Sequence, residues 1–379
     1  MDVVVTGIGL ESCLGSLTQS WANILAGKSG IRVQQPFSQL SAYPLGLISD
    51  RPSRLSPLTE LIVKAAITDA KLEFPLTQCG VVIGSSRGCQ NIWETIVTAN
   101  VTKNCSSFAP FSLHPNWLDT LPHQSAVTAA RLIETTAPVL SPMAACATGI
   151  QAIARGYELI QTGECQRVIA GAVETPITEL SLAGFERMGA LAKTGCYPFD
   201  RDREGLVLGE GGAVFVLETA ELARSRGATI YGSVLGFGLT CDATSTTAPQ
   251  GNSAAIAIKN CLQRSSLTPD NINYIHAHGT STRLNDNHEA KLIQHLFNHP
   301  VAVSSTKGAT GHTLGASGAL GVAWCLMALK SGYLPPCVGL KELEFDLNVV
   351  RETQQQQINK TLCFSFGFGG QNAVLAIGK

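Results

Sequence analysis

The sequence predicts an α/β fold made of two similar halves, on two observations. Short β-type runs alternate with helical patterns along all 379 residues, and glycines stand at many of the junctions. In each half, moreover, a strand leads into a helix rich in Gly and Ala, Ala147–Ile160 in the first half and Gly315–Leu329 in the second. Such small side chains allow close neighbours on several sides of a helix. We therefore place both helices in a buried layer between two mixed sheets.

The two halves are expected to divide at residue 227, giving units 1–227 and 228–379. The first half ends with the helix Ala220–Arg226, which Gly227 terminates. The second half begins with the strand Ile230–Leu239. The halves share a scheme of elements but no literal repeat of residues.

Apolar and β-branched runs predict the other strands of the first half: Val3–Thr6, Cys79–Gly84, Ala137–Leu140, Arg167–Glu174 and Gly209–Leu217. Helical periodicity predicts its other helices: Thr18–Ala26, Pro57–Asp69, Asn91–Val101 and Gln124–Ile133. The run Gly7-Ile8-Gly9 lacks the remaining features of a dinucleotide-binding fingerprint, so we interpret it as a turn at the end of the first strand. Ile31–Ser56, Ser106–Leu121 and Thr178–Leu191 are expected to be turns, loops or irregular chain.

The second half repeats the alternation. Its further predicted strands are Ile272–His278, Val301–Ser304, Leu362–Ser365 and Val374–Ile377, and its further helices are Ser253–Ser265 and Asp286–Phe297. The segment Pro198–Gly205, which alternates acidic and basic residues just before an apolar strand, is interpreted as a structural corner held by ion pairs.

Composition narrows the class of protein. A net charge of −1, with 15% charged and 45% hydrophobic residues, suits a large core and an oligomer interface. It gives no support for nucleic-acid binding or for a polybasic membrane contact. The apolar stretch Ala319–Leu329 is too short to span a bilayer and is expected to be a core helix.

The cysteines indicate the compartment. Twelve are scattered without CxxC pairs, so no zinc site is predicted. The first residues, Met-Asp-Val-Val-Val-Thr-Gly, enter a strand with no basic region before it. We therefore expect a cytoplasmic protein with reduced thiols.

Cys146 is the first candidate for chemistry. It lies in Ser141–Gly149, between an apolar β-type run and a helical pattern. The N–H groups and the positive dipole end of the helix favour an anion there, so the thiol is expected to ionise and act as a nucleophile. The alternative is a buried structural cysteine, which is the commoner fate in an Ala-rich segment.

Three further motifs follow predicted strands. His276-Ala277-His278-Gly279-Thr280-Ser281-Thr282 is one, the Lys307 to His312 loop is the second, and Ser365-Phe366-Gly367-Phe368-Gly369-Gly370 is the third. Each has a structural alternative: a core or helix-capping histidine, a surface lysine, a plain glycine turn.

Together the motifs indicate a thioester site. A thiolate attacks an acyl thioester, and two backbone N–H groups hold the tetrahedral oxyanion. Loss of CO₂ from a second substrate leaves an enolate, to which two neutral imidazoles donate hydrogen bonds. A nearby cation supports the electrostatic field around these histidines, and no metal or redox cofactor is required.

In these contexts Cys146, His278 and His312 resemble those of the β-ketoacyl-[acyl-carrier-protein] synthases, condensing enzymes of fatty-acid and polyketide synthesis, and the type II branch above all. The resemblance covers nearly the whole chain. It implies a thiolase-like, five-layered αβαβα fold with a duplicated core. It also implies a homodimer, an acyl carrier protein as partner, and substrates carried on its phosphopantetheine arm, with no bound cofactor.

The resemblance assigns expected roles residue by residue. Cys146 would take the acyl chain, and His278 and His312 would assist decarboxylation of the malonyl group, with Lys307 supporting His312. Phe368 resembles a gating phenylalanine, and its N–H with that of Cys146 would form the oxyanion hole. The pocket residues implied are Thr280 and Thr282 on the phosphopantetheine arm and Phe185 in the acyl pocket.

Some positions depart from the family pattern. Gly321 stands where most members carry a glutamate of the lysine–histidine network, and a water is expected in its place. Arg283 replaces a proline, Phe364 an asparagine and Gln371 a threonine. The stretch between Pro36 and Ser56 is shorter than usual. These departures indicate a divergent member, in a fatty-acid, specialised lipid or polyketide pathway.

Two rival functions remain open. A thiolase would use coenzyme A and a second cysteine, for which Cys363 is a candidate, although His278-Gly279-Thr280 is a synthase feature. A non-catalytic chain-length factor would shape the tunnel of a heterodimer, and Gly321 favours it. Such subunits typically lose the cysteine that this chain retains at position 146.

Overall fold

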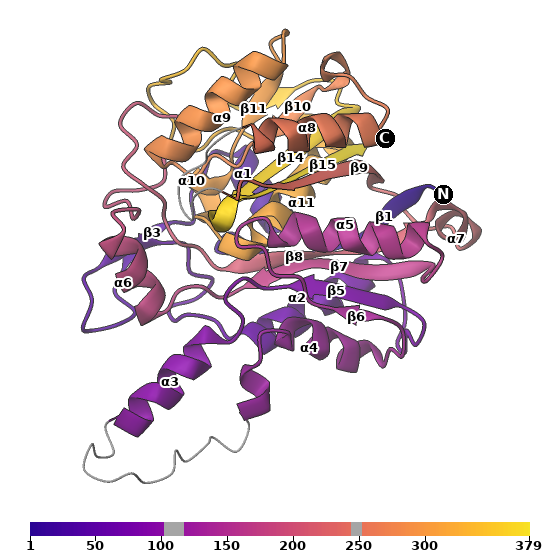
Figure 1. Cartoon of the computed structure of the whole chain (residues 1–379), viewed down its shortest axis with the longest axis horizontal. Coiled ribbons are helices and arrows are strands. Elements are labelled where there is room, and N and C mark those ends of the chain that lie inside the picture. The colour runs from indigo at the N-terminus through magenta and orange to yellow at the C-terminus, as the bar shows by residue number, and fades with distance from the viewer. Residues whose placement is uncertain (102–116, 244–251) are drawn as a thin grey trace.

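The computed structural model describes residues 1–101, 117–243 and 252–379. Most of the predicted loop Ser106–Leu121 lies outside this part, and its end forms the short 3₁₀ helix η1 (Trp117–Thr120). The described chain is an α/β structure in five layers, as Figure 1 shows.

Eleven strands form one hydrogen-bonded sheet in the described chain, in the order β11-β10-β14-β15-β9-β1-β8-β7-β5-β6, with β2 beside β1. They are β1 (Val3–Ser12), β2 (Gly15–Ser16), β5 (Gly80–Gly84), β6 (Val139–Leu140), β7 (Arg167–Glu174), β8 (Gly211–Thr219), β9 (Gly232–Cys241), β10 (Tyr274–His276), β11 (Ala302–Ser304), β14 (Lys360–Gly367) and β15 (Gln371–Gly378). Two small hairpins pair β3 (Arg32–Gln34) with β4 (Tyr43–Leu45), and β12 (Tyr333–Leu334) with β13 (Gln354–Gln355).

The helices fill the connections. They are α1 (Leu17–Leu25), α2 (Leu55–Asp69), α3 (Gln90–Val101), α4 (Gln124–Ile133), α5 (Thr148–Gln161), α6 (Glu179–Arg187), α7 (Ala220–Ser225), α8 (Ser253–Arg264), α9 (Arg283–Leu296), α10 (Lys307–Thr310) and α11 (Ser317–Ser331). Short 3₁₀ turns are η2 (Pro269–Asn271), η3 (Leu314–Ala316) and η4 (Phe368–Gly370).

The sheet repeats one pairing pattern. From β1 through β8, β7 and β5 to β6, two antiparallel pairs precede two parallel pairs. From β9 through β15, β14 and β10 to β11, the same order returns. The two sets join where β1 pairs antiparallel with β9, Val4 opposite Ser233. The duplicated core that the sequence predicts is therefore present, with its two sheets hydrogen-bonded along one edge.

The central layer consists of α5 and α11, between the two sets of strands (Figure 1). α2 and α4 cover the outer face of the β1–β6 set, and α8 and α9 cover that of the β9–β11 set. A Cβ atom on Gly149 of α5 would lie 2.6 Å from the backbone nitrogen of Ala319 in α11. The small residues thus bring the two helices into backbone contact, as the composition predicts.

The prediction of a turn at Gly7-Ile8-Gly9 is wrong, because β1 continues through both glycines to Ser12. The glycines serve packing instead. A Cβ on Gly9 would lie 1.9 Å from the carbonyl oxygen of Ile62, in α2. Glycine therefore allows α2 to lie directly on the strand.

Two stretches expected to be irregular contain regular structure. Thr178–Leu191 holds the helix α6, whose first turn Thr178 caps by accepting a hydrogen bond from the Ser181 N–H at 3.2 Å. Ile31–Ser56 holds β3 and β4, and Leu45 is fully buried. Neither stretch shows a clear period in sequence, because its apolar residues contact a core built by other segments.

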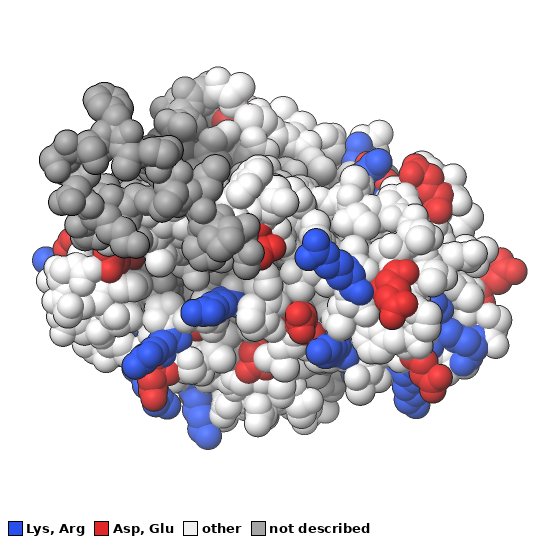
Figure 2. All heavy atoms as spheres, turned by 90° about the horizontal axis from the view of Figure 1, so that it is seen from below, with Lys and Arg blue, Asp and Glu red and all other residues white. Residues whose placement is uncertain are grey.

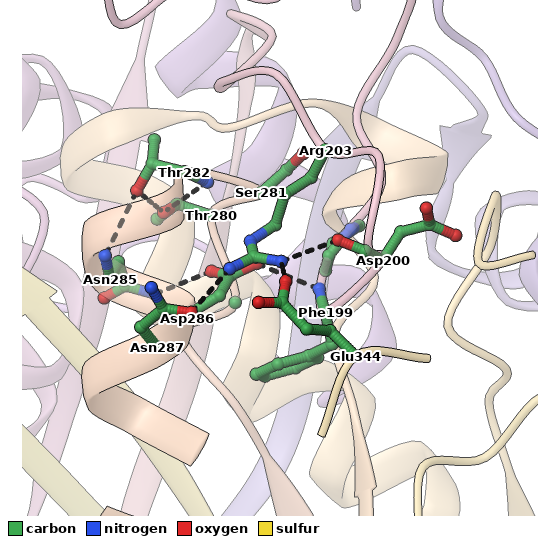
Figure 3. A network of polar contacts seen from close by, with 12 residues as sticks. Phe199, Asp200, Arg203, Thr280, Ser281, Thr282, Asn285, Asp286, Asn287 and Glu344 are labelled. Atoms are coloured by element: carbon green, nitrogen blue, oxygen red, sulfur yellow. Dashed lines mark hydrogen bonds and ion pairs between the residues drawn. The ribbon is translucent and has the colours of Figure 1, made fainter. Parts of the chain in front are cut away.

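The ion-pair corner predicted at Pro198–Gly205 is present (Figure 3). Arg203 is completely buried, lies 3.6 Å from the Asp286 carboxylate, pairs with Glu344 and donates to Asn287 at 2.7 Å. The Asp286 carboxylate also accepts the Phe199 N–H at 2.9 Å. The corner thus holds the start of α9 against the first half of the chain.

The mixed surface charge and the core position of the longest apolar helix fit the expectations from composition, whereas the prediction that this helix is too short to span a bilayer is wrong. Acidic and basic side chains are interspersed on the face shown in Figure 2. Leu314–Ser331 is long and apolar enough to cross a membrane, but 83% of it is buried in the fold. It is therefore a core helix.

Candidate active site

Cys146 lies at the start of α5, as predicted, in a tight turn. Ala145 has a positive φ of 47°, and Ser365 donates a hydrogen bond to the Cys146 carbonyl oxygen at 2.7 Å. A Cβ on Gly367 would lie 2.9 Å from the Cys146 nitrogen. The end of β14 can therefore approach the cysteine backbone only because residue 367 is glycine.

His278 and His312 converge on Cys146 from loops far away in the sequence. The Nε2 atom of His312 lies 3.4 Å from the sulfur, and the two imidazole rings are 5.3 Å apart at an angle of 81°. One ligand atom from each of the three residues falls within 4.8 Å of the others. This spacing would also admit a soft metal ion.

The tautomer of His312 follows from its second nitrogen. Leu314 donates its backbone N–H to Nδ1 at 3.2 Å, so in the neutral ring the proton is on Nε2. Burial, with the charge of Lys307, holds the pKa values of both His312 and His278 well below the usual range. His312 thus presents a neutral N–H donor toward the sulfur.

Lys307 lies behind this pair, completely enclosed. Its ammonium donates to the backbone carbonyl of His278. Burial lowers its pKa, which the nearby charge of Glu289 partly restores. Glu289 itself accepts the N–H groups of His278 and Gly279, at 2.6 and 2.7 Å. The loop that carries His278 is therefore clamped between a buried cation and a buried carboxyl group.

Cys146 differs from the sequence expectation in its ionisation. Burial raises the pKa of its thiol to about 11, although Lys307, Arg87 and the Phe368 N–H all act to lower it. The position at a helix start does not offset the loss of hydration. The resting site holds a neutral thiol at neutral pH.

Phe368 and Phe185 lie together beside the thiol. Their rings stack with centroids 6.3 Å apart, and the Phe368 N–H points to the sulfur of Cys146. Gly369 and Gly370 follow with φ values of 76° and 72°, which glycine adopts without strain. The Phe368 N–H therefore lies on the side of the thiol, and the oxyanion hole formed with the Cys146 N–H stays a prediction.

Thr280 and Thr282 line the same cavity from the loop after β10. Their hydroxyl oxygens are 2.9 Å apart, and Thr282 also caps α9. The cavity measures about 740 Å³ and contains every predicted site residue except Lys307.

The environment of Gly321 leaves no space for a side chain at this position. A Cβ there would lie 2.7 Å from both the His276 Nδ1 and the Cys363 sulfur. His276 is buried, and its Nε2 forms a hydrogen bond with the Thr306 hydroxyl oxygen at 3.1 Å. Burial lowers the pKa of His276 to about 3. A neutral ring and a thiol thus occupy this space.

Sequence reasoning missed two buried acids that organise the site, Glu289 and Glu174. Glu174 accepts N–H groups from Ser86 at 2.7 Å, Arg87 at 3.1 Å and Gly315 at 3.1 Å. It thereby ties the loop after β5 to the start of the α11 region. For Glu174 the sequence offers one signal, the apolar run that ends at this residue. A carboxyl group at the end of a buried strand needs hydrogen-bond partners.

The fold and the Cys–His–His group define the chain as a thiolase-like acyltransferase. The family models for the N-terminal and C-terminal domains of β-ketoacyl synthases match residues 53–223 and 231–341. The chain therefore belongs to the β-ketoacyl synthase family.

Curated relatives and solved structures support the same family. The chain is similar to 3-oxoacyl-[acyl-carrier-protein] synthase 2 of Synechocystis sp., at 36% identity over 100% of this chain and 98% of that protein. The enzyme of the same name from Staphylococcus aureus is 32% identical with the same coverage.

Two ketosynthase complexes resemble the fold. The ishigamide ketosynthase/chain length factor superposes with a TM-score of 0.92 at 27% identity, covering 100% of this chain and 99% of that one. A type II PKS ketosynthase in complex with its acyl-carrier protein gives 0.93 at 25%, with the same coverage.

Proposed function

We propose that the protein is a β-ketoacyl-[acyl-carrier-protein] synthase. The convergence of Cys146, His278 and His312 in one cavity carries this proposal. In the first step the Cys146 sulfur attacks an acyl thioester, the bond from the acyl carbon to the carrier sulfur breaks, and the carrier thiol leaves with the proton. The N–H groups of Cys146 and Phe368 hold the oxyanion.

In the second step a malonyl thioester loses CO₂. His278 and His312 offer hydrogen bonds to the enolate oxygen, for which their neutral state is suited, since both pKa values lie well below the usual range. The enolate carbon attacks the acyl carbonyl, a carbon–carbon bond forms, and the bond to Cys146 breaks. The product is a 3-oxoacyl thioester on the carrier.

The partner and the setting belong to the same proposal. Acyl carrier protein would present both substrates on its phosphopantetheine, with Thr280 and Thr282 holding the arm, and no further cofactor would be needed. The free thiols of the described cysteines suit a cytoplasmic protein. The edge strand β6, where Val139 is 38% exposed, with Met143 nearby at 55%, suits a homodimer interface.

The test is intact-mass analysis with acyl-carrier proteins of graded chain length, followed by malonyl-carrier protein. An adduct on wild type, absent in Cys146→Ala, that disappears with release of a product two carbons longer would support the synthase. An adduct that persists would contradict the decarboxylation step.

The second candidate is a chain-length-factor-like subunit, favoured by Gly321 and by the solved relative in complex with such a factor. It predicts no adduct with any carrier, and a stable heterodimer in place of a homodimer. Native and denaturing mass spectrometry of the purified assembly separates the two, because a homodimer yields one subunit mass and a heterodimer yields two.

A further inference from the structure

We propose that Arg87 selects acyl groups that carry an oxygen acceptor on their chain, in preference to plain hydrocarbon chains. This inference rests on the proposed function, because it names the acyl group that Cys146 receives. Arg87 belongs to the loop Ser85–Gly88 after β5 and lines the cavity that holds Cys146. This loop follows the strand equivalent to β10 in the duplicated sheet, so it faces the site as the His278 loop does.

The backbone of Arg87 is held in place. Glu174 accepts its N–H at 3.1 Å and the Ser86 N–H at 2.7 Å, while the Ser85 hydroxyl donates to the same carboxyl group at 2.6 Å. Gly88 in turn donates to the Ser85 hydroxyl at 2.9 Å. The position from which the guanidinium enters the cavity is therefore defined by buried contacts.

The side chain lies on the acyl side of the site. Its guanidinium carbon is 5.6 Å from the centroid of the Phe185 ring, and that ring stacks on Phe368. Phe185 is the residue expected in the acyl pocket, whereas the threonines expected to bind phosphopantetheine belong to the loop after β10. The positive charge also reaches the sulfur, since it lowers the pKa of Cys146.

Within residues 1–101, 117–243 and 252–379 the guanidinium has no anionic partner. Among the described residues it makes neither an ion pair nor a hydrogen bond, and its contact is the Phe185 ring. Glu204, another charged residue of the cavity, accepts the N–H groups of Lys193 and Thr194, at 2.9 and 3.2 Å. Five donors of Arg87 thus remain available to a bound molecule.

The neighbouring lining is apolar and includes Met188, Ala190, Leu206 and Leu314. Arg87 is exposed to solvent in the single chain, so a hydrocarbon chain that fills this space would displace water from the guanidinium and offer nothing in return. An oxo or carboxylate oxygen would instead accept a charge-assisted hydrogen bond. The expected discrimination is about 10- to 100-fold in the rate of acylation.

The experiment compares acylation of Cys146 by octanoyl-, 3-oxooctanoyl- and suberyl-carrier protein, followed by rapid-quench intact mass. We expect one or both oxygen-bearing chains to react at least about tenfold faster than octanoyl, and the two arms separate a keto oxygen from a carboxylate. Arg87→Leu should remove or reverse that preference, and Arg87→Lys should retain part of it.

Arg283→Leu is the matched control, because Arg283 is the other arginine of the cavity and lies at the start of α9. It should slow all three chains by one common factor. Equal rates in the wild type, or an unchanged ratio in Arg87→Leu, would overturn the inference while leaving the synthase intact. So would a change of oligomeric mass in Arg87→Leu without a change of ratio, since the arginine would then pair with a partner subunit. Failure of every chain to acylate Cys146 would overturn the proposed function as well.

Discussion

Cys146, His278 and His312 are all buried, and burial moves their pKa values in opposite directions for the same reason. The uncharged form of each group is favoured. The thiol therefore keeps its proton, and each imidazole carries one ring proton instead of the two of the charged form. Lys307 opposes this effect on the thiol, because its positive charge is the strongest influence that lowers the Cys146 pKa.

The thiol pKa predicts the pH dependence of alkylation. Below a pKa of about 11 the thiolate fraction rises tenfold for each pH unit, so the rate of Cys146 alkylation by iodoacetamide should rise steadily between pH 7 and 10. Peptide mapping separates Cys146 from the exposed Cys241. A plateau near neutral pH would contradict this, and would indicate a thiolate–imidazolium pair.

Removal of the buried cation should act on the same reaction. Lys307→Met raises the thiol pKa further, so alkylation at pH 8 should slow by about 3- to 10-fold. Lys330→Met is the control, since Lys330 is exposed and lies over the Tyr231 ring. Equal rates for Lys307→Met and wild type would show that the ammonium does not act on the sulfur.

At the scale of elements, glycines decide which helices and strands can meet. β1 accepts α2 because Gly9 has no side chain, and α5 meets α11 at Gly149. Gly321, in α11, allows the His276 ring to lie against the helix. The same residue type therefore places a core helix in one case and a site neighbour in another.

Gly9→Ala should lower the free energy of unfolding by about 3 kcal/mol, because the Cβ would overlap the Ile62 carbonyl oxygen. Urea denaturation measures the change. Gly184→Ala, in the exposed part of α6 with no atom within 4 Å of its Cβ, should instead stabilise by up to about 1 kcal/mol. A mild effect of Gly9→Ala would mean that α2 can move off the strand.

Gly321→Ala pits helix propensity against crowding. The gain of about 1 kcal/mol in propensity should be exceeded by the contact with His276 Nδ1 and the Cys363 sulfur, for a net loss of about 1–3 kcal/mol. His276→Asn removes part of the ring, so the double variant should lose at least about 1 kcal/mol less than the sum of the single losses. Additive losses would show that the two positions do not compete for space.

At the scale of the whole molecule, the site is assembled from both halves of the chain. Cys146 comes from the β6–α5 connection, and His278 and His312 follow β10 and β11. The Arg203 corner joins the halves beside the threonine loop, since it links residues 200, 286 and 344 in the interior (Figure 3). The position of one half relative to the other is thus fixed by a buried charge as well as by apolar packing.

Arg203→Met should cost about 3–5 kcal/mol of stability, because it leaves the buried Asp286 without its cation. Thermal and urea unfolding report the loss. Arg201→Met is the matched control two residues away, since its pair with Glu342 is 61% exposed on both sides and should be worth less than about 1 kcal/mol. Similar losses in the two variants would contradict a structural role for the buried network.

The sequence alone determined the alternation of strands and helices, the two Gly/Ala-rich helices and the positions of Cys146, His278, His312 and Lys307. These follow from local pattern and from motifs a few residues long, which the chain carries wherever it folds. The pattern of apolar residues also predicted both ends of α4 and of β7 correctly. The helix has one face in the core and the strand is buried on both faces, so both patterns are clear in the sequence.

Tertiary structure decided what depends on neighbours distant in sequence. Only the packed fold shows that β1 runs through its glycines, that burial outweighs the helix start in setting the Cys146 pKa, and that His276 takes the room beside Gly321. Glu174 and Glu289 likewise acquire their roles from N–H groups of other segments. Hydration loss and close contact arise between segments, so no single stretch of the sequence records them.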